Sequence, residues 1–184
     1  RATDNNEPFV AADDSAVTCA FDSLGRKLEE HQVLGGNDQI VSFGWTGVRQ
    51  RTSLTYPNGR KVGVSYDDLD RPDTFSNLVG APQPGWLAKY EYIGPGRILE
   101  RAYRNGTRLS FLNPQGTEAS GYDGDQRMVL LRHLSGHAVL AGFGYVLDRE
   151  DNRLSEARLH DGGRQDAWAY DSAYRLAHQQ RGAE

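Results

Sequence analysis

Short alternating segments of apolar and polar residues, separated by turn-forming residues, run along most of the chain. Residues 62–66 (VGVSY) show the two-residue period of a half-buried β-strand, and residues 98–103 and 108–112 also suit strands. From residue 57 onward a turn signal recurs roughly every ten residues, as in a meander of hairpins. No long helical period occurs, and the nearest candidate for a helix is 24–33. The pattern predicts an all-β chain of consecutive antiparallel β-hairpins.

A short word of residues recurs at the predicted turns. It consists of an aromatic residue, Asp, two spacers, a residue able to adopt the left-handed conformation, and Arg. The segment FDSLGR (21–26) fits the word fully, and YDDLDR (66–71) has Asp at the left-handed position. Looser copies are YDGDQR (122–127), YDSAYR (170–175), YIGPGR (92–97), which lacks the Asp, and a stretched copy at 145–153.

The word has the chemistry of a hairpin turn. An Asp carboxylate accepts hydrogen bonds from main-chain N–H groups just ahead of it and closes an Asx-turn. Two ordinary residues take the central positions of a type I turn, and Gly supplies the positive φ of the bulge that follows. Asp, Gln or Tyr stand at that position at some cost. The residues predicted to build these turns, with those of the Pro-Asn-Gly turn at 57–59, are Asp22, Gly25, Arg26, Gly59, Arg60, Asp67, Asp70, Arg71, Gly96, Arg97, Asp123, Arg127, Asp148, Arg153, Asp171 and Arg175.

Composition argues against disorder and against two kinds of partner. Nine Tyr, six Phe and three Trp are more aromatic residues than long disordered segments contain. The net charge is −4 and Lys and Arg form no run, so nucleic acid is not an expected partner. No apolar stretch reaches the roughly 18 residues of a spanning helix, so membrane insertion is not expected. The single cysteine, Cys19, lies in an apolar segment and is expected to be buried.

The repeated words resemble the YD repeats of the RHS family. The resemblance is carried by the YDxxGR-like copies, by TYPNGRKV before YDDLDR, and by GYVLDREDNR towards the C-terminal end, and it covers residues 17–178. That family includes bacterial RHS and wall-associated proteins, the C components of insecticidal toxin complexes, and teneurins. It implies a curved or spiralling sheet that is part of an RHS-type β-shell around a hollow interior. The chain is far shorter than a complete shell and lacks the core box that precedes self-cleavage, so neither autoproteolysis nor toxin activity is carried over.

The chain divides into two predicted parts. Residues 1–15 are polar and without periodicity, and are predicted to be a flexible N-terminal segment or linker. Residues 16–184 are predicted to form the YD-repeat β domain. Because the sequence starts at Arg1, without Met or a signal peptide, we expect a fragment of a longer chain.

Turn chemistry accounts for the candidate metal and catalytic groups. His133 and His137 flank a Ser-Gly pair where they can share a metal, but no Cys or acidic residue follows at ligand spacing. The acidic clusters at 67–70, 123–125 and 148–152 do not follow the EF-hand order. No GxSxG elbow and no phosphate-binding loop occur. We therefore expect no catalytic residue, no metal and no cofactor.

The tryptophans offer the main alternative to a purely structural function. Trp45, Trp86 and Trp168 either fill the packed face of the sheet or form a platform for stacking against carbohydrate. Trp86 lies beside a Pro-rich loop and is the first to test.

The sequence predicts a non-catalytic structural or interaction segment of a secreted or cell-surface, bacterial extracellular protein. This segment forms a rigid scaffold of β-hairpins, and its expected partners are other segments of its parent chain or other subunits. Two alternatives stay open: a carbohydrate-binding or adhesion module, and part of a toxin-encapsulating shell.

Overall fold

A computed structural model of the chain describes residues 15–80 and 84–182. The chain forms two compact units, Arg1–Leu87 and Ala88–Glu184. Apart from its last residue, the predicted N-terminal segment 1–15 lies outside the described residues.

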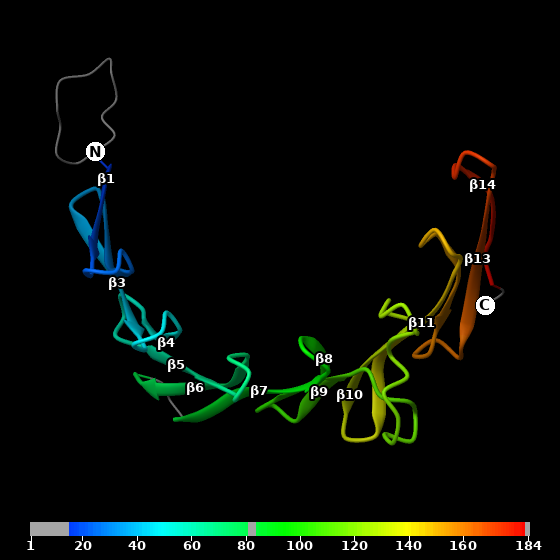
Figure 1. The fold of residues 1–184 in the computed structure, drawn as a ribbon, viewed down its shortest axis with the longest axis horizontal. Helices are drawn as coiled ribbons and strands as arrows, with labels where there is room; N and C mark the ends of the chain where they lie inside the picture. The colour runs from blue at the N-terminus through cyan, green and yellow to red at the C-terminus, as the bar shows by residue number, and fades with distance from the viewer. Residues whose placement is uncertain (1–14, 81–83, 183–184) are drawn as a thin grey trace, which may run out of the picture. The chain divides into compact units, whose positions relative to one another are not determined.

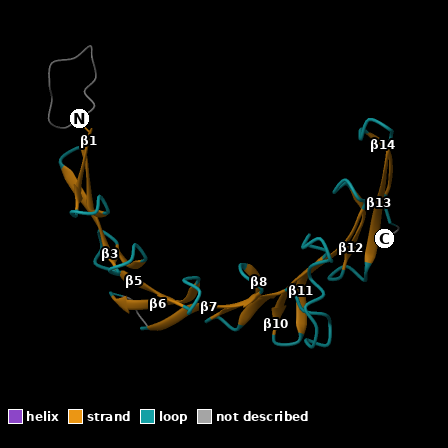
Figure 2. Ribbon diagram, in the orientation of Figure 1, coloured by secondary structure: helices purple, strands orange, loops and turns teal. Residues whose placement is uncertain are grey.

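The described residues form β-strands joined by turns, without a helix (Figure 2). Accordingly, no helix among them is suited to cross a membrane. Unit 1 contains β1 (Ser15–Phe21), β2 (Lys27–Leu34), β3 (Asn37–Trp45), β4 (Arg51–Thr55), β5 (Lys61–Tyr66) and β6 (Pro72–Val79). The boundary between the units falls within β7 (Gly85–Ile93). Unit 2 continues with β8 (Arg97–Tyr103), β9 (Thr107–Ser110), β10 (Leu130–Ser135), β11 (Ala138–Leu147), β12 (Arg153–Arg158), β13 (Arg164–Tyr170) and β14 (Leu176–Gln180).

The order of strands in the sheet is the order of strands in the sequence, from β1 to β14 (Figure 1). Described pairings are antiparallel, and each joins strands that follow one another in the chain. The predicted all-β fold of consecutive antiparallel hairpins is therefore confirmed. Two details differ. The helix candidate 24–33 lies mostly in β2, and the predicted strand 108–112 ends earlier, at Ser110 of β9.

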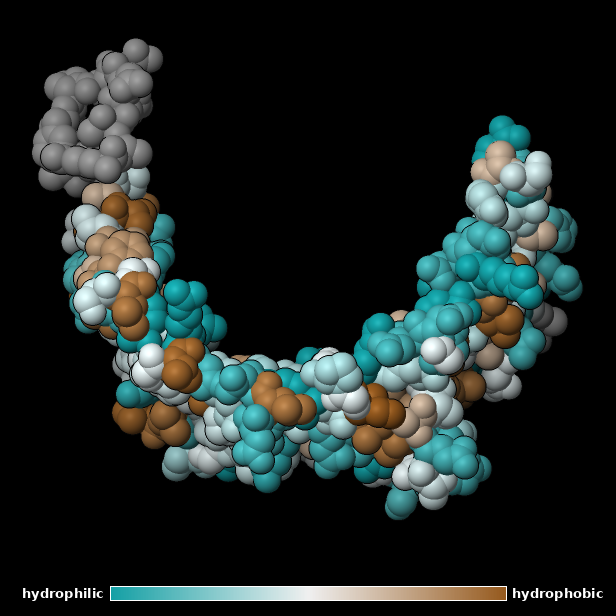
Figure 3. Space-filling view, in the orientation of Figure 1, coloured by the Kyte–Doolittle hydropathy of each residue, from teal (hydrophilic) through white to brown (hydrophobic). Residues whose placement is uncertain are grey.

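Few apolar side chains are buried, because the described strands of each unit form one sheet and carry no second layer. Ala88, Leu109, Phe111 and Leu134 are the buried apolar residues of the described part. In the view of Figure 3, hydrophobic residues form small separate patches among hydrophilic ones. Cys19 is exposed, so the expectation that it is buried is wrong. Its strand β1 pairs with β2 alone among the described strands, and nothing described there covers its face.

Successive antiparallel strands place alternate turns at opposite ends of the strands. In each unit, the turns that follow odd-numbered strands lie at one edge of the sheet, and because most of them are closed by an Asp carboxylate we call it the Asp-turn edge. It comprises residues 22–26, 46–50 and 67–71 in unit 1, and 93–97, 123–127, 148–152 and 171–175 in unit 2. The two turns in TYPNGRKVGVSYDDLDR thus lie at the two ends of β5, one at each edge of the sheet.

Candidate functional site

The first word, residues 21–26, forms a closed hairpin turn. The Gly25 N–H donates to the Asp22 carbonyl (3.0 Å) and the Asp22 N–H donates to the Arg26 carbonyl (3.0 Å). The Asp22 carboxylate accepts from the N–H groups of Leu24 and Arg26, both at 2.9 Å. Its second oxygen accepts from Arg26 Nε at 2.6 Å. One carboxylate thus orders both the loop and the arginine that opens the next strand.

The words at 67–71, 123–127 and 171–175 repeat this geometry. In each, the Asp carboxylate accepts two main-chain N–H groups at 2.9–3.0 Å. Its other oxygen accepts from the Arg Nε at 2.7–2.8 Å. The ion pairs of Asp67 with Arg71, Asp123 with Arg127, and Asp171 with Arg175 are therefore contacts within one turn.

These contacts hold the pKa of the turn carboxyls below the ordinary value for Asp. The main-chain N–H of Arg26 has the largest effect on Asp22, and the corresponding N–H groups act on Asp123 and Asp171. For Asp67 the largest effect comes from the Arg71 side chain. Desolvation opposes the lowering in every case. The ionised carboxylate is therefore the form that closes the turn.

In the four words that have both Asp and Arg, the fifth place has a positive φ whether or not it holds glycine. The φ angles are 73° at Gly25, 61° at Asp70, 62° at Gln126 and 57° at Tyr174. At Gln126 and Tyr174 a side chain occupies a backbone conformation that favours glycine, so these two turns carry local strain.

The copy at 145–153 is a turn of ordinary length. Asp148 accepts from the N–H groups of Glu150 and Asn152, and from the Asn152 side-chain amide at 2.8 Å. This last contact is also the largest cause of the lowered pKa of Asp148. Asn152, not Arg153, therefore stands where the other words have Arg. Arg153 begins β12, where its guanidinium lies over the Tyr145 ring at 4.4 Å and binds Glu156 at 2.7 Å.

The structure also contains a word that the sequence reading missed, WTGVRQ at residues 45–50. The Thr46 hydroxyl accepts from the N–H groups of Val48 (3.2 Å) and Gln50 (3.1 Å), as an Asp carboxylate does. The left-handed place is taken by Arg49, with φ 78°. The sequence signal for this turn is an aromatic residue followed by Thr in the place of Asp. A Thr hydroxyl can close the same kind of turn as an Asp carboxylate, although more weakly.

Two other predicted turns depart from the word. In the YIGPGR turn, Gly94 rather than Gly96 has a positive φ, 58°, and Arg97 pairs with Ile93 at the start of β8. At the opposite edge, Gly59 has φ 78° and donates to the Tyr56 carbonyl. Arg60 then contacts Asn77 of β6 through Nε and Nη2, at 3.1 and 2.9 Å.

In some words the last residue also reaches the next turn of the Asp-turn edge. In unit 1, Arg26 Nη1 donates to the Thr46 carbonyl at 2.5 Å, and Gln50 donates to the Asp70 carboxylate at 2.7 Å. Each contact joins residues 20 apart in the sequence. The turns of unit 1 are thus linked to one another by side chains as well as by the strands between them.

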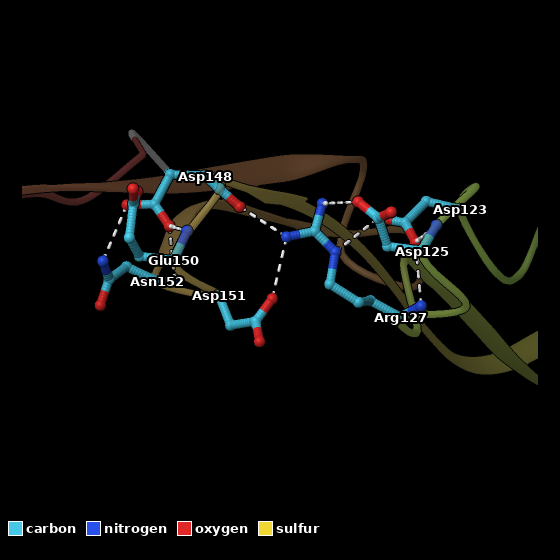
Figure 4. A network of polar contacts seen from close by, with 7 residues as sticks. All are labelled: Asp123, Asp125, Arg127, Asp148, Glu150, Asp151 and Asn152. Atoms are coloured by element: carbon cyan, nitrogen blue, oxygen red, sulfur yellow. Dashed lines mark hydrogen bonds and ion pairs between the residues drawn. The ribbon is translucent and has the colours of Figure 1, made fainter.

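Unit 2 has the same kind of link, and Figure 4 shows it. The guanidinium of Arg127 donates through Nε to Asp123 in its own turn. Its Nη1 donates to the Asp148 carbonyl at 2.5 Å and to the Asp151 carboxylate at 2.9 Å, both in the next turn. One planar group thus binds three acceptors on two turns, which suits the fixed fork of donors in Arg.

The three predicted stacking tryptophans lie on separate, non-neighbouring strands. Trp45 in β3 donates its indole N–H to the Lys27 carbonyl at 2.8 Å. Arginine guanidinium groups lie over the rings of Trp45 (Arg26, 5.9 Å) and Trp168 in β13 (Arg153, 5.8 Å). Trp86 is half-buried in β7. Within unit 1, Trp45 and Trp86 therefore do not lie on adjacent strands.

No group of three or more His, Cys, Asp or Glu side chains within residues 15–80 and 84–182 is arranged to hold a metal ion. His133 lies in β10, and His137 lies in the turn after it. The turn carboxylates accept hydrogen bonds from main-chain N–H groups and from arginines. These contacts hold each turn closed and connect turns to one another.

Two solved structures contain a fold similar to that of this chain. One is the crystal structure of TcdB2-TccC3-Cdc42, with a TM-score of 0.71, 13% identity, and coverage of 85% of this chain and 9% of that chain. The other is the crystal structure of TcdB2-TccC3 without hypervariable C-terminal region, with the same TM-score, identity and coverage of this chain, and 8% of that chain. At this identity the likeness concerns the fold alone, and the chain spans less than a tenth of either neighbour. No protein-family model and no curated protein matches the sequence.

Proposed function

We propose that the chain is a non-catalytic scaffold segment of a secreted or cell-surface RHS-type YD-repeat protein, where it contributes consecutive hairpins to a longer β-shell. The observation that carries the proposal is the linkage along the Asp-turn edge, through Arg26 to Thr46 and through Arg127 to Asp148. The residues that define the repeat close one turn and bind the next. Their ionised side chains therefore have a structural role.

Exposed apolar side chains support the proposal that other polypeptide segments cover this sheet. Val17, Phe21 and Leu28 on β1 and β2 are more than a third exposed, as is Leu176 on β14. A monomeric soluble sheet usually covers such side chains with a second layer. In the proposed shell, neighbouring segments of the parent chain or other subunits provide that cover.

Unpaired sheet edges support the same partners. Among the described strands, β1 pairs with β2 only and β14 with β13 only. A strand at the end of a sheet presents free main-chain donors and acceptors, which invite pairing with another strand. Consecutive hairpins before β1 and after β14 satisfy these groups in a longer protein.

The test uses Cys19, because this single cysteine is exposed on β1. A maleimide should modify Cys19 rapidly in the 184-residue chain. If the parent gene encodes further hairpins before Arg1, modification of Cys19 should slow at least about tenfold in the longer protein, because the neighbouring hairpins place side chains around the thiol and keep β1 from fraying. Peptide mass spectrometry measures the rate at Cys19 alone.

A matched control places the only cysteine of this chain at an exposed turn, with the changes Cys19→Ser and Ser172→Cys. Ser172 lies in the turn closed by Asp171 and should be modified equally fast in the short and the long protein. Equal rates at Cys19 in the two proteins would contradict the proposal.

A further inference from the structure

A cavity of about 220 Å³ lies in unit 2 over strands β8, β9 and β10. The strand register builds its floor. Ser110 in β9 pairs with Glu100 in β8 on one side and with Arg132 in β10 on the other, so these three side chains share a face. Arg108, two residues before Ser110, lies on that same face. The loop after β9 supplies a wall through Leu112, Pro114, Gln115 and Gly116.

Arg132 is the unusual member of this cavity. Its exposed fraction is 5%, which is rare for a guanidinium without a carboxylate partner. Its Nη2 donates to the carbonyls of Leu112 (2.8 Å) and Asn113. Its Nε is buried and has no hydrogen-bond partner. None of the ion pairs among the described residues includes Arg132.

The other charged groups of the cavity do not neutralise Arg132. Glu100 lies 3.6 Å from Arg108 Nε, so the one carboxylate of the cavity is already shared with a second arginine. Both burial and the nearby positive charge of Arg108 lower the pKa of Arg132, and Glu100 only partly opposes them. Because arginine stays protonated in proteins, the cavity keeps an excess of one positive charge.

A small side chain leaves room beside the guanidinium. Ser110, only 1% exposed, stands between Glu100 and Arg132 in the strand register and lines the cavity. The Ser110 hydroxyl accepts the Leu112 N–H at 3.3 Å and therefore keeps its own hydrogen for donation. His137, in the turn after β10, also lines the cavity.

We propose that this cavity is a binding site for one compact oxyanion, a carboxylate or a phosphate group, held by Arg132 and Arg108 with the Ser110 hydroxyl as a further donor. Guanidinium groups bind such oxyanions through charge-assisted hydrogen bonds. The volume is below the roughly 300 Å³ at which pockets begin to admit drug-sized molecules, so the cavity suits a single anionic group, either free or at the end of a side chain. The site does not depend on the proposed scaffold function.

The test is a titration of the ¹⁵N-labelled 184-residue chain at constant ionic strength, in which the signal of the Arg132 Nε–H is followed by NMR. The probes are inorganic phosphate, acetate, and a short peptide with blocked ends whose only charge is one Glu. A saturable shift of the Arg132 signal with any of them supports the site. Tighter binding of phosphate or acetate assigns it to free small anions, and tighter binding of the peptide assigns it to an acidic side chain of a polypeptide.

The discriminating variant is Arg108→Gln, because the Arg108 side chain is 42% exposed and glutamine can keep the aliphatic part of its packing, so the fold should stay intact. It should weaken binding about tenfold, as removal of one charge-assisted hydrogen bond does. The matched control is Arg101→Gln on β8, an arginine that also has a buried Nε without a hydrogen-bond partner but lies over the rings of Tyr90 and Tyr103. Absence of a saturable shift for every probe, or equal weakening by Arg108→Gln and Arg101→Gln, would overturn the proposal.

Discussion

The guanidinium of Arg127 donates a hydrogen bond to the main-chain carbonyl of Asp148, 2.5 Å away in the next turn of the Asp-turn edge. The same guanidinium also closes its own turn through Asp123. Arg26 stands in the same relation to Asp22 and Thr46 in unit 1. Arg26 and Arg127 thus each have two tasks, and only the second makes one hairpin depend on the next.

Arg127→Lys should destabilise the chain, because an ammonium cannot hold acceptors of two turns in a fixed fork. The matched change Arg175→Lys should have a smaller effect. Arg175 also binds its own Asp171, but its side chain is 80% exposed, and none of its described hydrogen bonds or ion pairs reaches another turn. Urea unfolding midpoints of the two variants measure the difference. Equal midpoints would mean that the link to Asp148 contributes nothing to stability.

Acid should weaken the fold through the turn carboxylates. The pKa values of Asp22, Asp67, Asp123 and Asp171 are lowered in the folded chain. The stability that these groups contribute is therefore present above the unfolded pKa of about 3.9 and is lost as the pH falls through the lower folded values. We expect the urea midpoint to change little between pH 7 and pH 5 and to fall steeply below pH 4.

Asp123→Asn isolates the ionisable part of this effect. The amide oxygen can still accept the N–H groups of Asp125 and Arg127, but it no longer titrates. The variant should be less stable than the parent chain at pH 7 and should lose less stability between pH 5 and pH 3. The control is Asp68→Asn. Asp68 is an exposed residue of the turn 67–71, and its replacement should leave the pH dependence of the parent chain unchanged. The same loss in both variants would contradict the assignment.

The sequence allows prediction of whatever depends on neighbouring residues. The all-β meander follows from the spacing of turn signals, and the turn of Asp22 to Arg26 follows from the hydrogen-bonding capacity of Asp and the permissive backbone of Gly. The turn at Thr46 escaped because the word was defined by Asp and Arg, although a Thr hydroxyl accepts the same N–H groups. The prediction placed Arg153 in the turn because the word calls for an arginine there. In the structure the side-chain amide of Asn152 makes the contact that arginine makes in the other words.

Contacts between strands could not be predicted in this way. The links from Arg26 to Thr46 and from Arg127 to Asp148 join residues 20 and 21 apart, and they require a known strand order. The proposed oxyanion cavity requires register as well, because Glu100, Ser110 and Arg132 share a face only when β8, β9 and β10 are aligned. A one-residue shift in pairing would turn these side chains to the other face.

Gln126→Gly should stabilise the chain by about 0.5–1 kcal/mol. Gln126 holds φ at 62°, a conformation that costs a side chain about 1–2 kcal/mol and costs glycine nothing, while the greater freedom of glycine in the unfolded chain offsets part of the gain. Gly25→Ala imposes the converse change at the same place of another word, where φ is 73° and no atom lies near the added methyl group. It should destabilise the chain by about 1 kcal/mol. Thermal and urea unfolding measure the change in the free energy of unfolding for both variants, and the two changes must have opposite signs.

Gly121→Ala should be among the most damaging of small substitutions. Gly121 is buried against Phe111, whose ring stacks on Tyr122 with centroids 5.0 Å apart. A Cβ at Gly121 would lie 2.5 Å from the Phe111 carbonyl oxygen and closer still to the Phe111 Cβ, and neither atom can move without displacing the strand end. The Gly121 N–H also donates to that carbonyl at 2.6 Å, so the two segments cannot separate without losing a main-chain hydrogen bond.

We expect Gly121→Ala to cost at least about 1–3 kcal/mol, the usual range for overpacking. The near-ultraviolet circular dichroism of the Phe111–Tyr122 pair should weaken with it. Gly124→Ala is the control in the same loop, because Gly124 has no positive φ and no atom lies within 4 Å of the added methyl group. That variant should stay within about 0.5 kcal/mol of the parent chain. If the two alanines proved equally tolerated, the loop between β9 and β10 would not pack on Phe111 in solution, and the cavity wall that the same loop provides beside Arg132 would be lost as well.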